Sequence, residues 1–168
     1  DLLVLGKALG GGILPIAAVL AGAELDVAGN YALGHYTHEK NPVTAKAALT
    51  TIEIIEQQNL VENAAVLGKY MLDQLNLLKD KHTSIGDVRG LGLLIGVELV
   101  LNRKQKTAAD DLAEDVLYRC LGRGLSFKIT MGNVLTLSPP LIITRKQIDL
   151  SLQIIDECIA EAEKAAGL

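Results

Sequence analysis

The sequence predicts an α/β segment over residues 1–58, followed by a small α+β domain over residues 59–168. Three observations carry this prediction. Residues 2–5 are an apolar run that ends in a glycine-rich turn, which is typical of a buried strand in a parallel or mixed sheet. Two long stretches with helical apolar spacing come after it. The rest of the chain alternates short, glycine-punctuated β-rich runs with two further helices.

Composition narrows the class of protein. The 168 residues are 49% hydrophobic and 21% charged, which is ordinary for a globular chain that can bury a core. A net charge of -4 argues against a nucleic-acid partner and disfavours an anionic membrane surface. Cys120 and Cys158 are far apart and lack CxxC spacing, so we expect reduced thiols and a cytoplasmic location. His35 and His38 have no second ligand pair at zinc spacing, so no metal is expected.

The chain opens on a strand, at Asp1, and we expect it to be a portion of a larger fold. The apolar opening over residues 2–23 could be taken for a signal peptide or a membrane span. Lys7 interrupts it, the glycines and Pro15 break it, and no basic region precedes it. We therefore expect neither a targeting signal nor a membrane segment here.

Lys7 is the candidate reactive residue of the opening stretch. It lies just past the carboxyl end of the predicted strand and is followed by three glycines, at positions 10–12. Ligands bind at this edge of open α/β sheets, and glycines let the backbone approach a ligand closely. A partly desolvated lysine there can act as an amine nucleophile toward a carbonyl. The alternative, left open by the residues alone, is a solvated lysine in a glycine-rich loop.

Strand and helix signals continue through the first half of the chain. Residues 13–22 are expected to form a second buried strand, and residues 24–34 a short helical or irregular connection. Asn41 and Pro42 suit the N-cap and first position of a helix over residues 43–58. That helix has an apolar stripe formed by Ala45, Ala48, Leu49, Ile52, Ile54 and Ile55.

A second helix over residues 60–82 is predicted to face the core with Val61, Ala64, Ala65, Leu67, Met71, Leu75 and Leu78. A hairpin comes next over residues 85–100, turning around Gly90 and Gly92. Arg89 could bind a substrate anion or pair with a local carboxylate such as Asp87. We favour the pairing.

Two capping boxes mark the remaining helices. Thr107 and Asp110 are predicted to begin a helix that ends near Arg123. Residues 125–129 and 133–137 read as two short strands. Thr144 and Gln147 are predicted to begin the last helix, which ends near residue 166.

Four segments resemble the class III (ornithine/4-aminobutyrate type) aminotransferases, in the order in which that family has them. They are Gly-Lys-Ala-Leu-Gly-Gly-Gly with the following Leu-Pro-Ile-Ala-Ala (residues 6–18), Tyr-Thr-His-Glu-Lys-Asn-Pro (36–42), Val-Arg-Gly-Leu-Gly (88–92) and Ser-Pro-Pro-Leu-Ile-Ile-Thr (138–144). The resemblance covers essentially the whole chain. It implies that residues 1–58 are the end of a fold type I PLP-binding large domain with its interdomain helix. Residues 59–168 would then be the small C-terminal domain.

The resemblance also assigns roles to two residues. Lys7 matches the catalytic lysine that binds pyridoxal 5'-phosphate (PLP) as a Schiff base. Thr37 matches a threonine that reaches the cofactor phosphate of the neighbouring subunit, so a homodimer with shared active sites is implied. The common family form has an aromatic residue and two glycines between this threonine and the Asn-Pro pair. This chain has His38, Glu39 and Lys40 instead.

The implied function is transfer of an amino group from an amine or ω-amino acid to a 2-oxo acid. Many relatives that bind an α-carboxylate have arginine at the place of Thr136, three residues before the Pro-Pro pair. Without that arginine, we expect an ω-amino acid, an amine or a phosphorylated amine as substrate. Two alternatives stay open: an ammonia-lyase or phospho-lyase of the same family, and a folding and dimerisation fragment that is inactive by itself.

Overall fold

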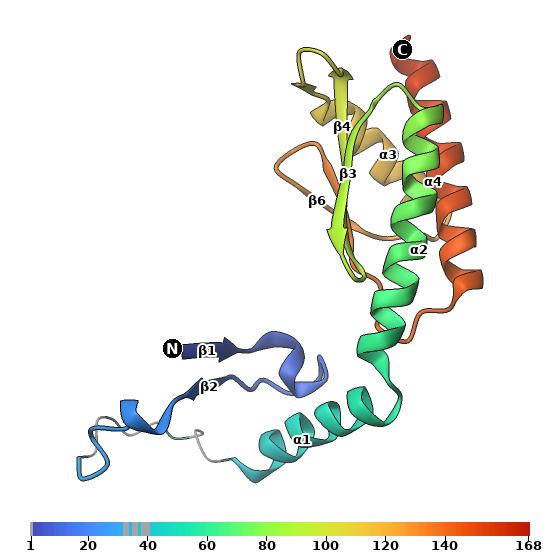
Figure 1. Cartoon of the computed structure of the whole chain (residues 1–168). Coiled ribbons are helices and arrows are strands. Elements are labelled where there is room, and N and C mark those ends of the chain that lie inside the picture. The colour runs from blue at the N-terminus through green and yellow to red at the C-terminus, as the bar shows by residue number, and fades with distance from the viewer. Residues whose placement is uncertain (1, 32–33, 35–36, 38–40) are drawn as a thin grey trace. The chain divides into compact units, whose positions relative to one another are not determined.

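The structure is a computed structural model that describes residues 2–31, 34, 37 and 41–168 (Figure 1). The chain divides into two compact units, Asp1–Asn59 and Leu60–Leu168. Figure 1 labels most of the helices and strands, and the remaining ones follow the same numbering in chain order.

The first unit contains a two-stranded sheet. Strands β1 (Leu2–Leu5) and β2 (Ala18–Ala21) pair antiparallel, with Leu3 opposite Leu20. The strand β1 is mostly exposed in this chain, so the expectation that it is buried is wrong here. Val4 is 71% exposed because β2 is the strand that pairs with β1 among the described residues, and the faces of this hairpin stay open.

Short helical turns and one long helix complete the first unit. The 3₁₀ turns η1 (Lys7–Gly10) and η2 (Ala23–Leu25) come after β1 and β2. Helix α1 (Pro42–Gln57) begins as predicted: the Asn41 side-chain oxygen accepts a hydrogen bond from the Val43 amide at 2.9 Å, and Pro42 takes the first position. α1 packs against η1.

The second unit packs helices onto an antiparallel sheet. Its elements in chain order are α2 (Leu60–Lys81), β3 (Ile85–Leu91), β4 (Leu94–Asn102), β5 (Thr107–Ala108), α3 (Asp110–Gly122), β6 (Lys128–Thr130), β7 (Val134–Leu137) and α4 (Arg145–Ala166). The strand order is β3-β4-β7-β6, and β5 pairs with β4. The hairpin predicted around Gly90 and Gly92 is confirmed as β3 and β4.

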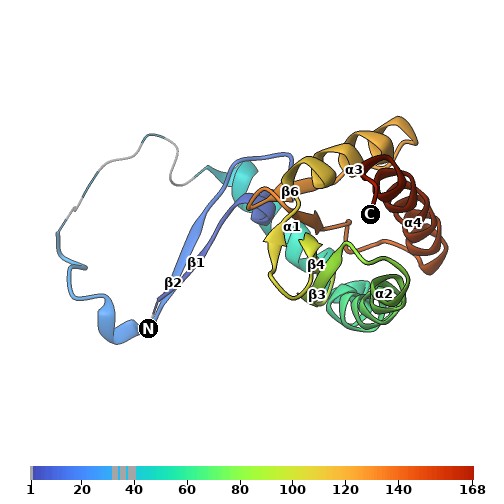
Figure 2. The same ribbon diagram turned by 90° about the horizontal axis from the view of Figure 1, so that it is seen from above.

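Helices α2, α3 and α4 lie on one side of this sheet (Figure 2). Every second residue of β4 points into the core between them, and Ile95, Val97 and Leu99 are each at most 1% exposed. They meet Leu75 of α2 and Ile155 of α4, which are fully buried. This contact between the sheet and the helices forms the core of the second unit.

Two of the local expectations for this unit are corrected. Thr107 does not cap a helix: it lies in β5 opposite Asn102, and α3 begins at Asp110 after Ala109 without a side-chain cap. Pairing with β4 satisfies the backbone there and takes precedence over the local capping signal. Val61 and Ala65 of α2 are exposed instead of facing the core, Val61 by 72%. The capping box of Thr144 and Gln147 at the start of α4 is confirmed.

None of the helices in the part of the chain described by the structure is both long enough and apolar enough to cross a membrane.

Candidate functional site

Lys7 lies at the junction between β1 and η1 in an unusual backbone conformation. Its φ angle is +48°, in the left-handed region that residues other than glycine adopt uncommonly. Such residues cost energy to hold and concentrate at functional sites. Lys7 thus lies just past the end of β1, and the surrounding loop must hold its backbone in this conformation.

The glycines after Lys7 let the loop lie close to its neighbours. Gly10 is buried, and a Cβ built there would come within 3.2 Å of the Ile16 side chain. Gly11 has a φ angle of +72°, and a Cβ built on it would lie 3.1 Å from the Thr51 hydroxyl oxygen of α1. Helix α1 thus supports the loop that carries the lysine, through positions where a larger residue would crowd it.

The Lys7 side chain is exposed in this chain, and not partly desolvated as the sequence suggested. The cause is the open β1–β2 hairpin, which leaves the end of β1 uncovered. An exposed primary amine at the carboxyl end of a strand remains suited to attack a carbonyl carbon. The residues present therefore fit the amine that a carbonyl cofactor requires.

Thr37 is exposed and lies in a turn. Its hydroxyl group is a suitable donor to a phosphate oxygen. The neighbouring departures from the family form, His38, Glu39 and Lys40, lie outside the described residues. In the part of the chain that the structure describes, no hydrogen bond joins Thr37 to Lys7.

Arg89 of β3 is engaged by local carboxylates, as the sequence favoured. Its guanidinium nitrogen Nη1 lies 2.6 Å from Glu98 of β4 and 3.0 Å from Asp87. The hydrogen bond from Arg89 holds the pKa of the Asp87 carboxyl below its usual value. These contacts assign Arg89 to the surface of the sheet and do not leave it free for a substrate anion.

Thr136 occupies the middle of β7, opposite Gly96 of β4 on one side and Lys128 of β6 on the other. Its hydroxyl lies 2.8 Å from the hydroxyl of Thr130, and both side chains are half-buried. The strand position where many relatives carry a guanidinium thus holds a short hydroxyl pair. A hydroxyl cannot form the two parallel bonds that an arginine offers a carboxylate.

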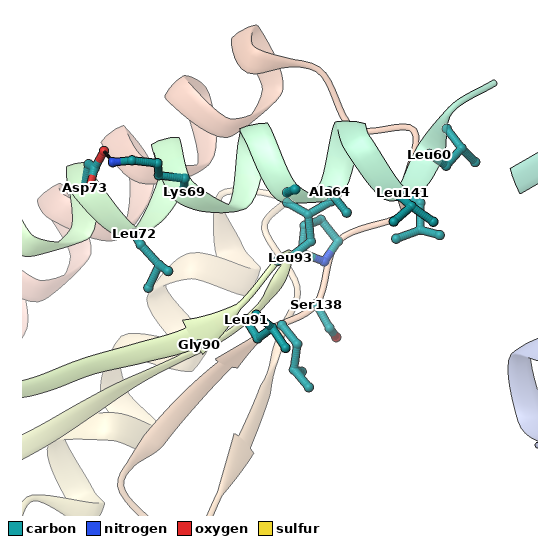
Figure 3. A pocket seen from close by; sticks show the side chains of 15 residues that line it. Leu60, Ala64, Lys69, Leu72, Asp73, Gly90, Leu91, Leu93, Ser138 and Leu141 are labelled. Atoms are coloured by element: carbon teal, nitrogen blue, oxygen red, sulfur yellow. Dashed lines mark hydrogen bonds and ion pairs between the residues drawn. The ribbon is translucent and has the colours of Figure 1, made fainter. Parts of the chain in front are cut away.

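An apolar pocket of about 740 Å³ in the second unit was not anticipated from the sequence. Figure 3 shows Leu60, Ala64 and Leu72 of α2 along one side of it, with Leu91 and Leu93 at the β3–β4 turn opposite. Its charged pair is Lys69 with Asp73, 2.7 Å apart and exposed. Because these two groups bind each other, the pocket offers mainly shape and apolar surface, with Ser138 as a further polar side chain in its lining.

The described residues contain no metal-binding cluster, and both cysteines are buried. No group of three or more His, Cys, Asp or Glu side chains there is arranged to hold a metal ion. Cys120 of α3 and Cys158 of α4 are free and fully buried. Burial raises the pKa of the Cys120 thiol to about 12, so this thiol is not a nucleophile at neutral pH.

Comparison with known proteins settles the family. The pattern of the family described as aminotransferase class-III matches residues 1–159. The chain belongs to this family. The resemblance noted in the sequence is confirmed, and with it the PLP-dependent class of enzyme to which the Lys7 segment is similar.

Individual class-III relatives differ in the reaction they catalyse. The chain is 48% identical over 164 residues to a (R)-1-hydroxy-2-aminoethylphosphonate ammonia-lyase from Vibrio splendidus. It is 42% identical to a leucine/methionine racemase from Thermococcus litoralis and 36% identical to an acetylornithine aminotransferase from Methanocaldococcus jannaschii. These matches cover 98% of this chain but 34%, 37% and 38% of the relatives, so the chain spans little more than a third of their length.

Solved transaminase structures have the same fold. An amine transaminase from an uncultivated Pseudomonas species, in its PLP-bound form, matches 96% of this chain with a TM-score of 0.88 and 27% identity. That match covers 38% of the transaminase chain.

Proposed function

We propose that the enzyme containing this chain is a PLP-dependent aminotransferase that moves an amino group from an amine or ω-amino acid to a 2-oxo acid. The observation that carries this proposal is Lys7: an exposed amine, held with a positive φ at the end of β1, in a chain of the class-III family. Because the chain spans little more than a third of its relatives, the activity is proposed for the whole enzyme.

Lys7 and Thr37 are the residues of this chain that would hold the cofactor. Lys7 Nζ would bind it covalently, and the Thr37 hydroxyl would donate a hydrogen bond to its phosphate from the partner subunit. PLP, when bound, withdraws electrons from the substrate carbon next to the amine. The Lys7 amine, once released, would take the proton from that carbon as a general base and return it as a general acid.

The position of Thr136 supports a substrate without an α-carboxylate next to the amine. The Thr130–Thr136 hydroxyl pair can donate one hydrogen bond outward while the other proton bridges the two oxygens. This suits a neutral or singly contacted polar group better than a bidentate carboxylate. An amine, an ω-amino acid or a phosphorylated amine therefore fits this strand better than ornithine.

A second candidate, an ammonia-lyase, is favoured by one specific observation. The identity to the phosphonate ammonia-lyase is 48%, against 36% to the acetylornithine aminotransferase, over nearly the same residues of this chain. Both reactions begin with removal of a proton beside the amine, so Lys7 would have the same role in each. They differ in the later steps, because a lyase expels a leaving group whereas an aminotransferase needs a second, 2-oxo acid substrate.

A homodimer in the cytoplasm is proposed with the function. The dimer rests on the role that the resemblance gives Thr37, which would reach the cofactor phosphate of the neighbouring subunit. The free thiols of Cys120 and Cys158 agree with a reducing compartment.

The test is to measure product with the whole enzyme, supplied with PLP and an amine, in the presence and absence of pyruvate as the 2-oxo acid. The aminotransferase proposal predicts that alanine accumulates only with pyruvate and that Lys7→Ala abolishes it. Ammonium release without pyruvate would identify the lyase. Activity that survives in Lys7→Ala would contradict both. Lys46→Ala, a lysine of α1 loosely paired with Glu53 at 4.0 Å, is the matched control that should leave activity unchanged.

A further inference from the structure

Behind the sheet of the second unit, a buried histidine lies between two carboxylates. His82 directly follows α2, and its side chain is 3% exposed. Its ring nitrogen Nε2 lies 2.6 Å from Asp156, and Nδ1 lies 2.8 Å from Glu163. Asp156 and Glu163 are seven residues apart on α4, so two turns of the helix present both carboxylates to the same ring.

Further charges surround this cluster. From α2, the Lys81 ammonium contacts both oxygens of Asp156, at 2.6 and 2.7 Å. From the end of β4, Arg103 donates to the backbone carbonyl oxygen of His82 at 2.6 Å. Between α2 and β3, the Ser84 amide donates to the second oxygen of Glu163 at 3.0 Å. Helices α2 and α4, the α2–β3 connection and the residue after β4 thus each contribute a charge or a hydrogen bond.

We infer that His82 is a doubly protonated imidazolium that clamps the end of α2 to the C-terminal half of α4, and that this clamp makes the attachment of α4 pH-sensitive. A carboxylate only accepts hydrogen bonds, so each ring nitrogen must donate a proton to its own carboxylate. A neutral ring has one N–H and would turn a lone pair toward the other carboxylate at under 3 Å. The positive charges of Lys81 and Arg103 disfavour a charged ring, but neither side chain binds a ring nitrogen of His82.

The carboxylates stay ionised in this arrangement. Burial alone would raise the pKa of Asp156, but hydrogen bonds from Lys81 and His82 hold it below its usual value. Burial likewise raises the pKa of Glu163, and hydrogen bonds from His82 and Ser84 outweigh it.

Loss of the second ring proton releases one carboxylate. The folded chain then keeps one of the two ring hydrogen bonds, and the C-terminal half of α4 from Asp156 onward is held less firmly. This loosening of α4 is confined to the second unit and does not depend on the cofactor. Alkaline pH should loosen the end of α4 before the rest of the sheet and helices are affected.

The experiment uses the 168-residue chain, labelled with ¹⁵N, and reads the ring nitrogens of His82 by NMR at pH 7. We expect both nitrogens to carry a proton and both to couple to carboxylates. A neutral ring with one bare nitrogen would overturn the inference. The His82→Gln variant identifies the signal by its absence.

Amide hydrogen exchange provides an independent readout. After correction for the intrinsic pH dependence, exchange in residues 157–166 should become about 10- to 100-fold faster when the pH is raised from neutral to alkaline values, the effect of losing one hydrogen bond to a charged group. His82→Gln should exchange quickly at both pH values. Glu157→Gln, which removes an exposed carboxylate that binds Arg123 2.7 Å away, should keep the pH dependence of the wild type. Equal protection at both pH values in the wild type would contradict the clamp.

Discussion

Gly68 of α2 lies directly against the backbone of Gly92 at the β3–β4 turn, where a Cβ on Gly68 would overlap the carbonyl group of Gly92. Gly92 itself has a φ angle of +55°. The contact brings helix and hairpin together closely enough that no side chain fits between them. Gly92 lines the apolar pocket, and Gly68 packs against Gly92.

Gly68→Ala should therefore destabilise the second unit. We expect a loss of about 1–3 kcal/mol in the free energy of unfolding, because the obstacle is backbone and cannot rotate away. Urea titration followed by circular dichroism measures it. Gly122→Ala, at the end of α3 where a Cβ meets nothing within 4 Å, is the matched control and should be neutral or stabilising. Equal effects of the two substitutions would contradict the close packing.

Acid should weaken the same unit through Asp156 and Glu163. Both carboxyls have a pKa below the usual value in the folded chain, through the hydrogen bonds that outweigh burial. A group with a lowered folded pKa stabilises the fold above its unfolded pKa, and this stability disappears as pH falls through the folded value. We expect the unfolding free energy to decline below about pH 4. An Asp156→Asn and Glu163→Gln double variant should be less stable at pH 7 and show a shallower decline. A decline as steep as in the wild type would argue against this origin.

Sequence signals that act over a few residues predicted the structure well. Asn41 with Pro42, and Thr144 with Gln147, begin helices where their side chains indicate, since caps satisfy nearby backbone groups. The prediction for Thr107 was wrong because pairing with a strand five residues earlier replaced the cap. The His82 cluster joins residues more than 70 positions apart, and no local pattern reports such a contact.

For the candidate site too, the sequence predicted the short-range features and missed those that depend on distant residues. The strand and glycines around Lys7 are a short-range pattern, and the sequence placed that lysine at the end of β1. Its exposure depends on which surfaces pack over the hairpin, which the order of residues 2–12 does not specify. The apolar pocket likewise arises where α2, the β3–β4 turn and the Ser138–Pro139 segment converge.

Thr37→Ala should weaken cofactor binding in the whole enzyme by about 1–2 kcal/mol, the scale of a hydrogen bond to a charged group. Titration with PLP followed by absorbance measures the affinity. A mixed dimer with Lys7→Ala in one subunit and Thr37→Ala in the other tests whether the hydroxyl acts across subunits: one of its two sites should retain both residues. Thr83→Ala, an exposed threonine outside the loop, is the control. Unchanged affinity in Thr37→Ala would remove the threonine from the site.

Thr136→Arg should shift the substrate preference toward α-amino acids. A guanidinium at this place of β7 offers the bidentate contact that the hydroxyl pair lacks, and we expect roughly a 10- to 100-fold gain in kcat/KM for ornithine relative to a simple amine. Thr130→Val, which removes the partner hydroxyl without adding charge, separates the gain from loss of the Thr130–Thr136 bond. A preference unchanged by arginine would place substrate recognition elsewhere.

Reduction of the PLP-loaded whole enzyme with borohydride, with the labelled peptide mapped by mass spectrometry, tests the role of Lys7 without any assumption about the substrate. We predict a single pyridoxyl label on Lys7, the residue that begins the 3₁₀ turn after β1, and loss of that label in Lys7→Ala. A label on Lys46 or another lysine, with Lys7 unmodified, would contradict the assignment of Lys7 as the cofactor lysine.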